Sequence, residues 1–429
     1  MTQPAPLKHN PGRMSRRESR LAFGMIAPTI IGVMAIVLFP LLATFWISFK
    51  PIELADLRPP TVKVTESRPK IKDDIITLKY KLRNSSKDKE VRAVTLTDAR
   101  TKGLTILESD PRCDISATQI FCDMGTFAPK QAETLLITAK IDAALVAAYT
   151  SKEIYTKDSK PVSEGSADNP IVAEPFTLAN FTKVFSLAEF NTVLVTTFAY
   201  TFFSTLGALI VGLFAAQILQ YAFPGRSIFR GFMLFPYVAP VIAVAYTWIV
   251  LLDPTSGSLN ALLIQMGAMD APINFFGIRT KDIDIMGFTL PLPLALTMVI
   301  MFEIWRYFPL AFLFILARMQ SVPQDMYEAA DMDGASPFQQ FWALSLPQLV
   351  GILSVLFLLR FIWTFNKFDD IFLLTGGAAG TRTLTVQVYE QAFAINNLGT
   401  GCAVAVVIFA LLAAFATLYF WTMPEEEGL

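Results

Sequence analysis

Residues 321–347 read SVPQDMYEAADMDGASPFQQFWALSLP, a polar stretch between two long apolar runs. The composition of this stretch predicts two short helices with a break between them. Ser321 and Ser336 each stand where a helix would begin, with a proline close behind and a glutamine three residues on, which is the pattern of a capping box. Gly334 lies between them and supplies the left-handed residue that commonly ends a helix. We therefore expect a stiff, capped corner.

The runs around this corner are long enough to cross a membrane. An α-helix rises about 1.5 Å per residue, so about 20 apolar residues span the hydrocarbon layer. Six such runs occur, at about residues 21–49, 192–219, 231–252, 288–316, 349–374 and 398–422. The sequence thus predicts an α-helical membrane protein with six transmembrane helices. Prolines such as Pro240 and Pro309 lie within the runs and indicate kinked helices, although prolines are ordinary in membrane helices.

Composition excludes several other classes of protein. Of the 429 residues, 53% are hydrophobic and only 17% are charged, against about 25% in a soluble domain, and the mean hydropathy is +0.48. The net charge of −1 gives no indication of nucleic-acid binding. One histidine, His9, and three cysteines exclude histidine-based catalysis and a four-cysteine zinc site, so no metal site and no catalytic residue is predicted.

Charge is distributed unevenly along the chain. Residues 51–176 hold 38 of the 71 charged side chains, which predicts a soluble domain inserted after the first transmembrane helix. Within it, apolar and polar residues alternate at 75–82, 91–97 and 134–141, which predicts short strands and a β-sandwich. Its last part, 141–175, is rich in Ala, Ser, Lys and Asp and is expected to be a partly flexible return to the membrane. Residues 177–189 then predict an amphipathic helix on the outer surface.

The termini indicate the orientation in the membrane. Residues 1–20 form a basic tail with five Lys or Arg against one acid, which predicts a cytoplasmic N-terminus followed by transmembrane helix 1 at 21–50. A signal peptide is the alternative, but its apolar region is only about 7–15 residues long. Six crossings would leave the tail 423–429 in the cytoplasm and residues 51–190 outside it.

The inserted segment also resembles a known class of domain. The patterns Tyr80-x-Leu82-x-Asn84 and Cys122-Asp123-Met124-Gly125-Thr126-Phe127 resemble the immunoglobulin-like repeat domains of bacterial surface proteins. Cys113 and Cys122 are separated by eight residues, and a disulfide between them is expected in an oxidising compartment. Two unpaired thiols remain the alternative, because sequence does not give the Cα spacing that a disulfide requires.

The polar corner carries a more specific pattern. Glu328-Ala329-Ala330, Asp333-Gly334-Ala335 and Leu346-Pro347 resemble, at the family's spacing, the EAA loop of binding-protein-dependent ABC importer permeases. The resemblance implies a type I permease fold, with a core at 177–422 and a coupling loop at 318–347 that docks in a groove of a cytoplasmic ATPase. The ATPase-coupling residues that it implies are Glu328, Ala329, Ala330, Asp333 and Gly334.

Other segments are similar to the carbohydrate-uptake branch of that family, closest to the MalF type, which also carries an outer immunoglobulin-like insertion. They are 230–240, Trp248-x4-Asp253-Pro254-x2-Gly257-x2-Asn260, Trp305-x3-Pro309 and Phe365-Asn366-Lys367-Phe368-Asp369. The chain departs from the commonest form at Ala378, where proline is usual. The resemblance implies a non-catalytic permease subunit for a maltose-like oligosaccharide or α-glucoside. It implies a second permease subunit, two ABC ATPase subunits and an extracytoplasmic solute-binding protein as partners. The chain has no Gly-x4-Gly-Lys-Ser/Thr loop, so ATP is expected on the ATPase and no cofactor on this chain.

Polar and aromatic residues in the predicted spans are candidates for contacting a sugar. They are Asn366, Asp369, Tyr246, Glu303, Trp363 and Tyr237. A polar or ionisable residue at membrane depth is a functional hypothesis by default, and Asn366 lies in the segment that resembles the family's sugar-contacting helix. Glu303 could instead pair with Arg306, three residues along the helix. Trp363, like Trp305, could instead anchor or pack a helix.

Three other functions stay open from the sequence. Glycerol-phosphate and polyol importers share the motifs of the carbohydrate branch. A membrane-anchored surface receptor or adhesion protein would account for residues 51–140, but not for five further spans or the corner. An ion-coupled transporter working alone would account for the spans only.

Overall fold

The computed structural model describes residues 13–72, 74–86, 88–100, 103–142, 160–285 and 288–422. The chain divides into two compact units, Lys50–Phe176 and a helical unit made of Met1–Phe49 and Thr177–Leu429. The predicted insertion, 51–176, differs from the first unit by one residue. The tails 1–12 and 423–429, and the segment 143–159 within the predicted flexible end, lie outside the described residues.

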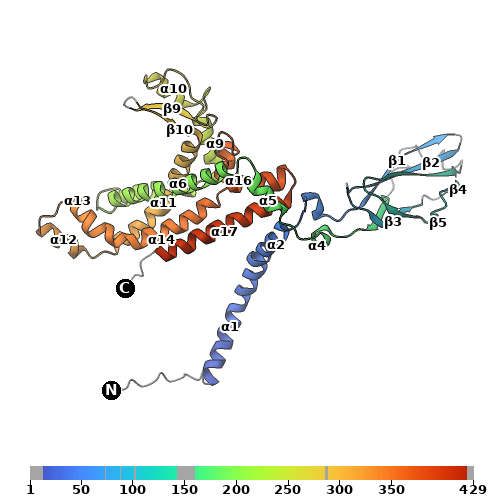
Figure 1. Ribbon diagram of the computed structural model, residues 1–429, viewed down its shortest axis with the longest axis horizontal. Coiled ribbons are helices and arrows are strands. Elements are labelled where there is room, and N and C mark those ends of the chain that lie inside the picture. The colour runs from blue at the N-terminus through green and yellow to red at the C-terminus, as the bar shows by residue number, and fades with distance from the viewer. Residues whose placement is uncertain are drawn as a thin grey trace. The chain divides into compact units, whose positions relative to one another are not determined.

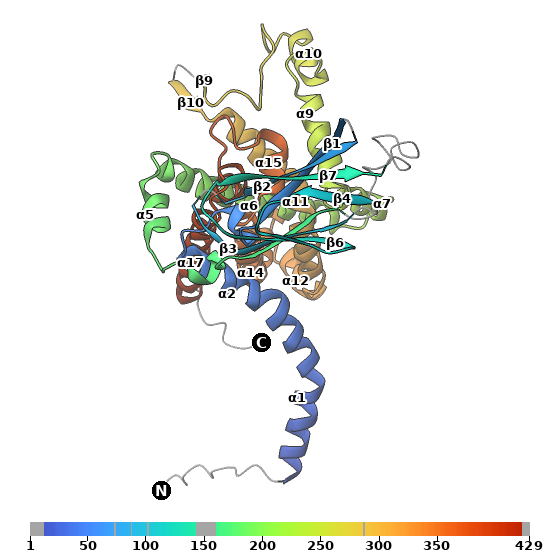
Figure 2. The same cartoon turned by 90° about the vertical axis from the view of Figure 1, so that its right-hand side faces the viewer.

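The unit Lys50–Phe176 contains two antiparallel sheets of four strands (Figure 2). The first sheet has the order β1 (Val62–Lys72), β2 (Ile75–Asn84), β7 (Ala132–Ile141) and β4 (Leu104–Glu108). The second has the order β5 (Cys113–Ile115), β6 (Gln119–Phe127), β3 (Val91–Ala99) and β8 (Val162–Ser166). The strands predicted at 75–82, 91–97 and 134–141 correspond to β2, β3 and β7. The segment predicted as a return to the membrane contains β8 and the short helix α4 (Pro170–Ala173).

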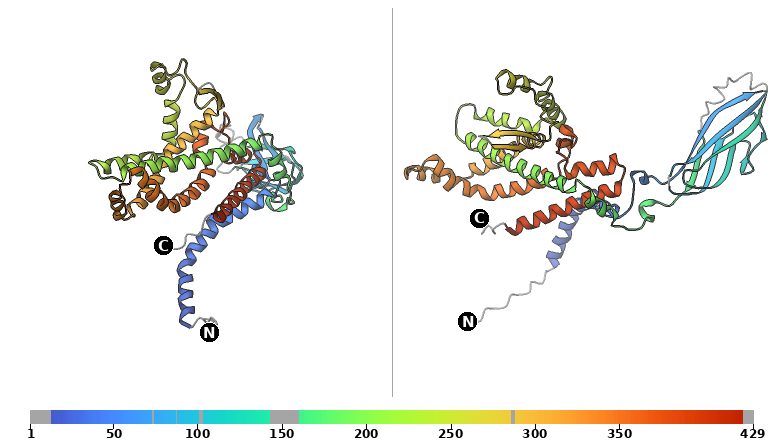
Figure 3. Two further views of the ribbon diagram at one scale, coloured as in Figure 1. Left: turned by 60° about the vertical axis from the view of Figure 1, so that its left-hand side comes forward. Right: turned by 45° about the horizontal axis from the view of Figure 1, so that its top comes forward.

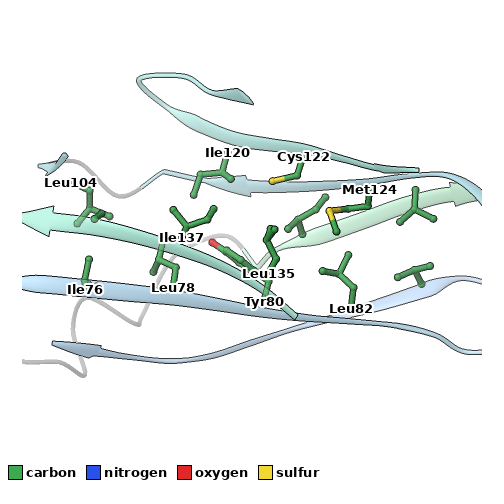
Figure 4. Close-up of a cluster of buried hydrophobic side chains, with 14 of the residues drawn as sticks. Ile76, Leu78, Tyr80, Leu82, Leu104, Ile120, Cys122, Met124, Leu135 and Ile137 are labelled. Atoms are coloured by element: carbon green, nitrogen blue, oxygen red, sulfur yellow. The ribbon is translucent and has the colours of Figure 1, made fainter. Parts of the chain in front are cut away.

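One hydrophobic core joins the two sheets of this unit (Figure 4). Alternate residues of β2 point into it, because successive side chains of a strand face opposite sides. Tyr80 on β2 is fully buried, and its hydroxyl donates to Asp98 Oδ2 on β3 at 2.6 Å. Burial and this hydrogen bond raise the pKa of Tyr80 well above its usual value. The protonated hydroxyl therefore bridges the two sheets.

Cys113 and Cys122 are joined by a disulfide in the second sheet. The two residues lie opposite each other in the register of β5 with β6. Cys122 is fully buried and Cys113 packs at the edge of the same core. The bond therefore fastens the short edge strand β5 to the sheet.

The helical unit is built around long apolar helices (Figures 1 and 3). They are α1 (Arg13–Val33) continued by the π segment η1 (Met34–Leu38) and α2 (Phe39–Ser48), then α6 (Phe190–Leu219), α11 (Leu294–Gln320), α14 (Leu346–Phe365) and α17 (Leu398–Thr422). Within the described residues, five helices are long and apolar enough to cross a membrane, or six if one bent pair counts as a span. The runs predicted at 192–219 and 398–422 correspond to α6 and α17. The amphipathic segment predicted at 177–189 contains α5 (Ala179–Ser186).

Helices α6 and α11 pack closely because α6 carries a glycine at the contact. A Cβ atom on Gly212 would lie 2.7 Å from Ala311 Cβ and 2.8 Å from the backbone nitrogen of Phe312. Small residues let membrane helices approach each other, where dispersion forces take the place of the hydrophobic effect. Gly212 is therefore one of the residues that allow the close approach of the two helices.

The third predicted span, 231–252, is not one straight helix. It consists of α7 (Arg226–Met233) and α8 (Phe235–Val238), followed after a bend of 92° by α9 (Val241–Leu251). Pro240 lies at the bend and Ala239 before it is extended, as the residue before a proline prefers to be. The break therefore follows from the proline.

The fourth span begins later than predicted. Residues 288–292 form the strand β10 (Phe288–Leu292), which pairs with β9 (Lys281–Ile285), and α11 begins at Leu294.

The segment between α9 and β9 contains the helix α10 (Ser258–Gln265). It starts at Asp253, where hydrogen bonds from Thr255 and Ser256 lower the pKa of the carboxyl group to about 2. The charged side chain thus organises this turn.

The fifth span begins earlier than predicted. Helix α13 (Pro337–Gln340), the π segment η3 (Phe341–Ser345) and α14 form one continuous helix, Pro337–Phe365. The helix ends at Phe365, and a separate helix, α15 (Asp369–Thr375), follows. The predicted run 349–374 is therefore interrupted toward its C-terminal end by residues 366–368.

Candidate functional site

The corner predicted at 321–347 contains α12 (Gln324–Met332) and α13. Gly334 has φ +76°, as expected for the residue that ends a helix. The second predicted capping box is present, because Ser336 Oγ accepts from the Gln339 N–H and Gln339 Oε1 accepts from the Ser336 N–H. The first is wrong: Ser321 Oγ donates to the Arg318 carbonyl at 2.7 Å, because it lies at the end of α11 where carbonyls lack helical partners.

Most of the predicted coupling residues lie on the surface of this corner. Glu328, Ala329, Asp333 and Gly334 are exposed, and Ala330 is half-buried. Within the part of the chain that the structure describes, the Glu328 carboxylate makes no ion pair or hydrogen bond. Two large apolar side chains at the same corner are also strongly exposed, Met332 at 89% and Phe338 at 71%. The corner thus offers a free carboxylate beside apolar surface.

A second candidate site lies at the break between α14 and α15. Asn366 and Asp369 were predicted on the fifth helix; Asn366 instead lies in this break and Asp369 begins α15, because the helix ends at Phe365. An open, shallow pocket of about 340 Å³ lies beside Asn366. Its other walls come from α16 (Leu384–Tyr389), the π segment η4 (Glu390–Ala394) and α17. The lining residues are Asn366, Phe368, Thr385, Val388, Tyr389, Phe393, Ala405 and Ile408.

Aromatic rings form much of this pocket. The ring centroids of Phe368 and Tyr389 are 5.2 Å apart, and those of Tyr389 and Phe393 are 5.5 Å apart. The Asn366 side-chain nitrogen donates to the Ile362 carbonyl at 2.9 Å, which leaves its amide oxygen to accept from a ligand. None of the eight lining residues carries a charge. The pocket is therefore suited to an uncharged ligand with hydroxyl groups and apolar ring faces.

A cluster of buried charged side chains lies near the break between α14 and α15. Glu303 on α11 and Arg360 on α14 form an ion pair with 2.9 Å between Oε1 and Nη2, and both residues are buried. Glu303 thus pairs with Arg360 rather than with Arg306, its alternative partner on the same helix. Arg306 Nε lies 3.9 Å from the carboxylate of Asp370 on α15. Both contacts join different helices, which spacing along one helix does not reveal.

Tyr307 lies at the centre of this charged cluster. The Lys367 ammonium donates to its hydroxyl and also lies 3.4 Å from Asp370 Oδ2. The Arg360 guanidinium lies 4.2 Å from the centroid of the Tyr307 ring, within the range of a cation–π interaction. The Thr385 hydroxyl donates to the Lys367 carbonyl at 2.6 Å. These contacts fix the break against α11 and α16.

Of the remaining candidates, Tyr237 and Asp369 contact this cluster. The Tyr237 ring contacts the Tyr307 ring, with centroids 5.9 Å apart. Asp369 is half exposed and lies 3.5 Å from the Lys367 ammonium. Tyr246 and Trp363 are also about half exposed, and neither lines the pocket.

Sequence reasoning missed several residues of these sites. Arg360 and Asp370 lie in the apolar run 349–374, so the rule for ionisable residues at membrane depth would have found both. Tyr389 and Phe393 carry no such signal, because aromatic residues are common in membrane helices. Trp305 packs against Trp248, with ring centroids 5.6 Å apart, as its packing alternative expected.

Comparison with known proteins identifies the family. The model of the family described as binding-protein-dependent transport system inner membrane component matches residues 208–422, half of the chain. The chain is 33% identical over 251 residues to the trehalose/maltose transport system permease protein MalF of Thermococcus litoralis, covering 58% of this chain and 80% of that one. It is 32% identical over 249 residues to the inner membrane ABC transporter permease protein YcjO of Escherichia coli, covering 57% and 79%. The chain belongs to this family of membrane-embedded ABC transporter permeases.

Solved structures share the fold. A bacterial ABC transporter that imports the acidic polysaccharide alginate has a chain that matches with a TM-score of 0.51 at 18% identity, covering 58% of this chain and 85% of that one. A structure of an alginate transporter in complex with a pentasaccharide-bound periplasmic protein matches with a TM-score of 0.50 at 18% identity, covering 57% and 81%. The helical unit therefore has the fold of ABC importer permeases.

Proposed function

We propose that this chain is the permease subunit of an ATP-driven importer of a neutral carbohydrate. Its type of substrate is a maltose-like oligosaccharide or an α-glucoside. The observation that carries the proposal is the uncharged, aromatic-walled pocket beside Asn366. Apolar ring faces can pack on Phe368 and Tyr389, while the amide oxygen of Asn366 accepts from a sugar hydroxyl. The trehalose/maltose permease to which the chain is similar supports the same class of substrate.

The pocket favours a neutral sugar over glycerol phosphate. A phosphate group is recognised by Arg, Lys or clustered backbone N–H groups, and the eight lining residues supply no cation. The nearest cation along the chain, Lys367, is bound to Tyr307 and paired with Asp370. A polyol importer remains the second candidate, since a polyol is also uncharged.

The chain supplies half of the translocation path, and its partners supply the rest. These partners are a second permease subunit, two ABC ATPase subunits that bind ATP, and an extracytoplasmic solute-binding protein. Glu328, Ala329, Ala330, Asp333 and Gly334 form the surface that couples to the ATPase. Support comes from the free Glu328 carboxylate and the exposed apolar side chains beside it, since exposed apolar surface commonly marks a protein interface.

The two-sheet unit lies outside the cytoplasm in this proposal and contacts the solute-binding protein. Both termini then lie in the cytoplasm. The disulfide between Cys113 and Cys122 supports this orientation, because disulfides persist in oxidising compartments and are rare in the cytosol. The basic tail before the first span supports it independently.

Transport by the complete complex in proteoliposomes tests the proposal. The complex should take up labelled maltose or trehalose only with internal ATP and external solute-binding protein, and glycerol 3-phosphate should not compete. Uptake by this chain alone without ATP would overturn the proposal in favour of an ion-coupled transporter. If the complex takes up glycerol 3-phosphate but neither maltose nor trehalose, the assignment of the substrate is wrong.

Replacing the pocket amide should weaken sugar binding. We expect Asn366→Ala to raise the apparent KM for sugar about three- to tenfold, because one hydrogen bond to an uncharged hydroxyl is lost. Initial rates of uptake at varied sugar-loaded binding protein measure this effect. Asn274→Ala serves as the control, since Asn274 lies in the loop between α10 and β9 and does not line the pocket. Equal KM values for both variants would remove Asn366 from the site.

A further inference from the structure

Helix α12 is fastened to the following continuous helix by two hydrogen bonds between polar side chains, besides a weaker one of 3.5 Å from Gln348 Nε2 to Met326 Sδ. Gln340 Nε2 donates to Asp331 Oδ1 at 2.6 Å and to the Ala335 carbonyl at 3.1 Å. The Tyr327 and Ser345 hydroxyl groups lie 2.9 Å apart. These pairs connect residues 9 and 18 positions apart in the sequence. We call them the Asp331–Gln340 clamp and the Tyr327–Ser345 clamp.

The corner itself would be a poor mechanical link without the clamps. Between α12 and α13 the chain runs through Gly334 at φ +76°. Apart from its own chain neighbours, no atom of the described residues lies within 4 Å of the position that a Cβ on Gly334 would occupy, so side-chain packing does not brace this turn. Backbone hydrogen bonds from Gly334 to Asp331 and from Ala335 to Ala330 end α12 but do not reach α13. Glycine allows wide backbone rotation, so the turn is the natural hinge.

The clamps join α12 to a long continuous element. Ser345 is buried at the end of η3, and α13, η3 and α14 run without a break from Pro337 to Phe365. Its 29 residues correspond to a rod about 43 Å long. Asn366 follows directly at the far end of this rod. A displacement of α12 that reaches Gln340 and Ser345 therefore reaches the pocket through one helix.

We propose that Gln340 and Tyr327 are positioning residues that lock α12 to this rod, so that movement imposed on α12 by the ATPase is transmitted to the pocket rather than absorbed at Gly334. The inference rests on the proposed import function. Gln340 and Tyr327 are not among the five predicted coupling residues, but they transmit the movement of those residues to the rod. Neither residue needs to touch the ATPase or the sugar.

The number of ATP molecules hydrolysed per sugar imported by the complete complex tests this inference. Gln340→Ala, which removes two hydrogen bonds, and Tyr327→Phe, which removes one, should each raise that ratio about three- to tenfold. Asp331→Asn should restore most of the coupling lost in Asp331→Ala, because the asparagine carbonyl can still accept from Gln340. Asp325→Ala is the matched control, since it removes an exposed carboxylate of α12 but neither clamp.

Hydrogen exchange of the purified chain gives a second readout that does not depend on transport. The amides of Gly334 and Ala335 should exchange several times faster in Gln340→Ala than in Asp325→Ala. Unchanged exchange, or an unchanged ratio of ATP to sugar in a complex that imports sugar, would overturn the inference. A wild-type complex that imports no sugar would instead overturn the proposed function, and the two failures are therefore distinguishable.

Discussion

Glu303→Gln alone should lower the free energy of unfolding by about 3–5 kcal/mol, because it leaves the Arg360 guanidinium buried without its counter-charge. Arg360→Met should cost a similar amount for the converse reason, and it also removes the contact with the Tyr307 ring. The exposed fractions of Glu303 and Arg360 are 0% and 2%, so water cannot replace the missing partner. We therefore expect these to be the most destabilising single polar substitutions in the helical unit.

The double variant Glu303→Gln/Arg360→Met separates a charge effect from a packing effect. It should recover most of the lost stability, since replacing both partners of a buried pair is often nearly neutral. Denaturant unfolding in detergent, followed by tryptophan fluorescence, measures all three variants. All six tryptophans, Trp305 near the ion pair among them, lie in the helical unit. A double variant as unstable as the sum of the singles would show that the pair contributes through packing alone.

Gly334→Pro should reduce ATP-driven uptake about tenfold or more while leaving the basal ATPase activity of the complex. Proline fixes φ near −65° and lacks an N–H group, whereas Gly334 has φ +76° and its N–H donates to the Asp331 carbonyl at 3.0 Å. The corner must then rebuild, at a cost of about 3 kcal/mol if proline behaves as it does inside a helix. Parallel assays of uptake and ATP hydrolysis in proteoliposomes measure the loss of coupling.

Gly334→Asn is the control for this prediction. Asparagine tolerates the left-handed region, and a side chain at position 334 meets no other part of this chain within the described residues. Near-normal uptake in Gly334→Asn would show that only the backbone conformation matters. A loss as large as that of Gly334→Pro would mean instead that the ATPase approaches this position too closely for any side chain. Normal uptake in Gly334→Pro would remove the corner from the coupling pathway.

Local signals in the sequence predicted much of the fold and of the corner. Alternation predicted β2, β3 and β7, and the match of 398–422 to α17 follows from a long apolar run that contains no proline. Ser336 and Gly334 act through their immediate neighbours, so their roles could be read from the sequence. Ser321 failed as a cap because α11 continues to Gln320, and the end of that helix competes for the serine hydroxyl.

Features that depend on register between helices could not be predicted. The break after Phe365 contains no proline or glycine, and it is fixed by Tyr307 and Thr385 from two other helices. Glu303 has a possible partner on its own helix but pairs across to Arg360, a choice set by the packing of α11 on α14. The pocket likewise requires Tyr389 to be brought to Asn366 from a segment more than 20 residues away. Sequence spacing carries none of this information.

The two chain segments of the helical unit that flank the inserted two-sheet unit are hydrogen-bonded to each other. The Thr177 N–H donates to the Phe49 carbonyl at 2.7 Å, and the Asn180 side chain donates to the Ser48 carbonyl at 2.9 Å. The chain therefore leaves the helical unit and returns to it at a single point. Because the two ends lie side by side, an insertion at this junction does not require any helix to move. The two-sheet unit and the helical unit can thus diverge independently, each under its own selection.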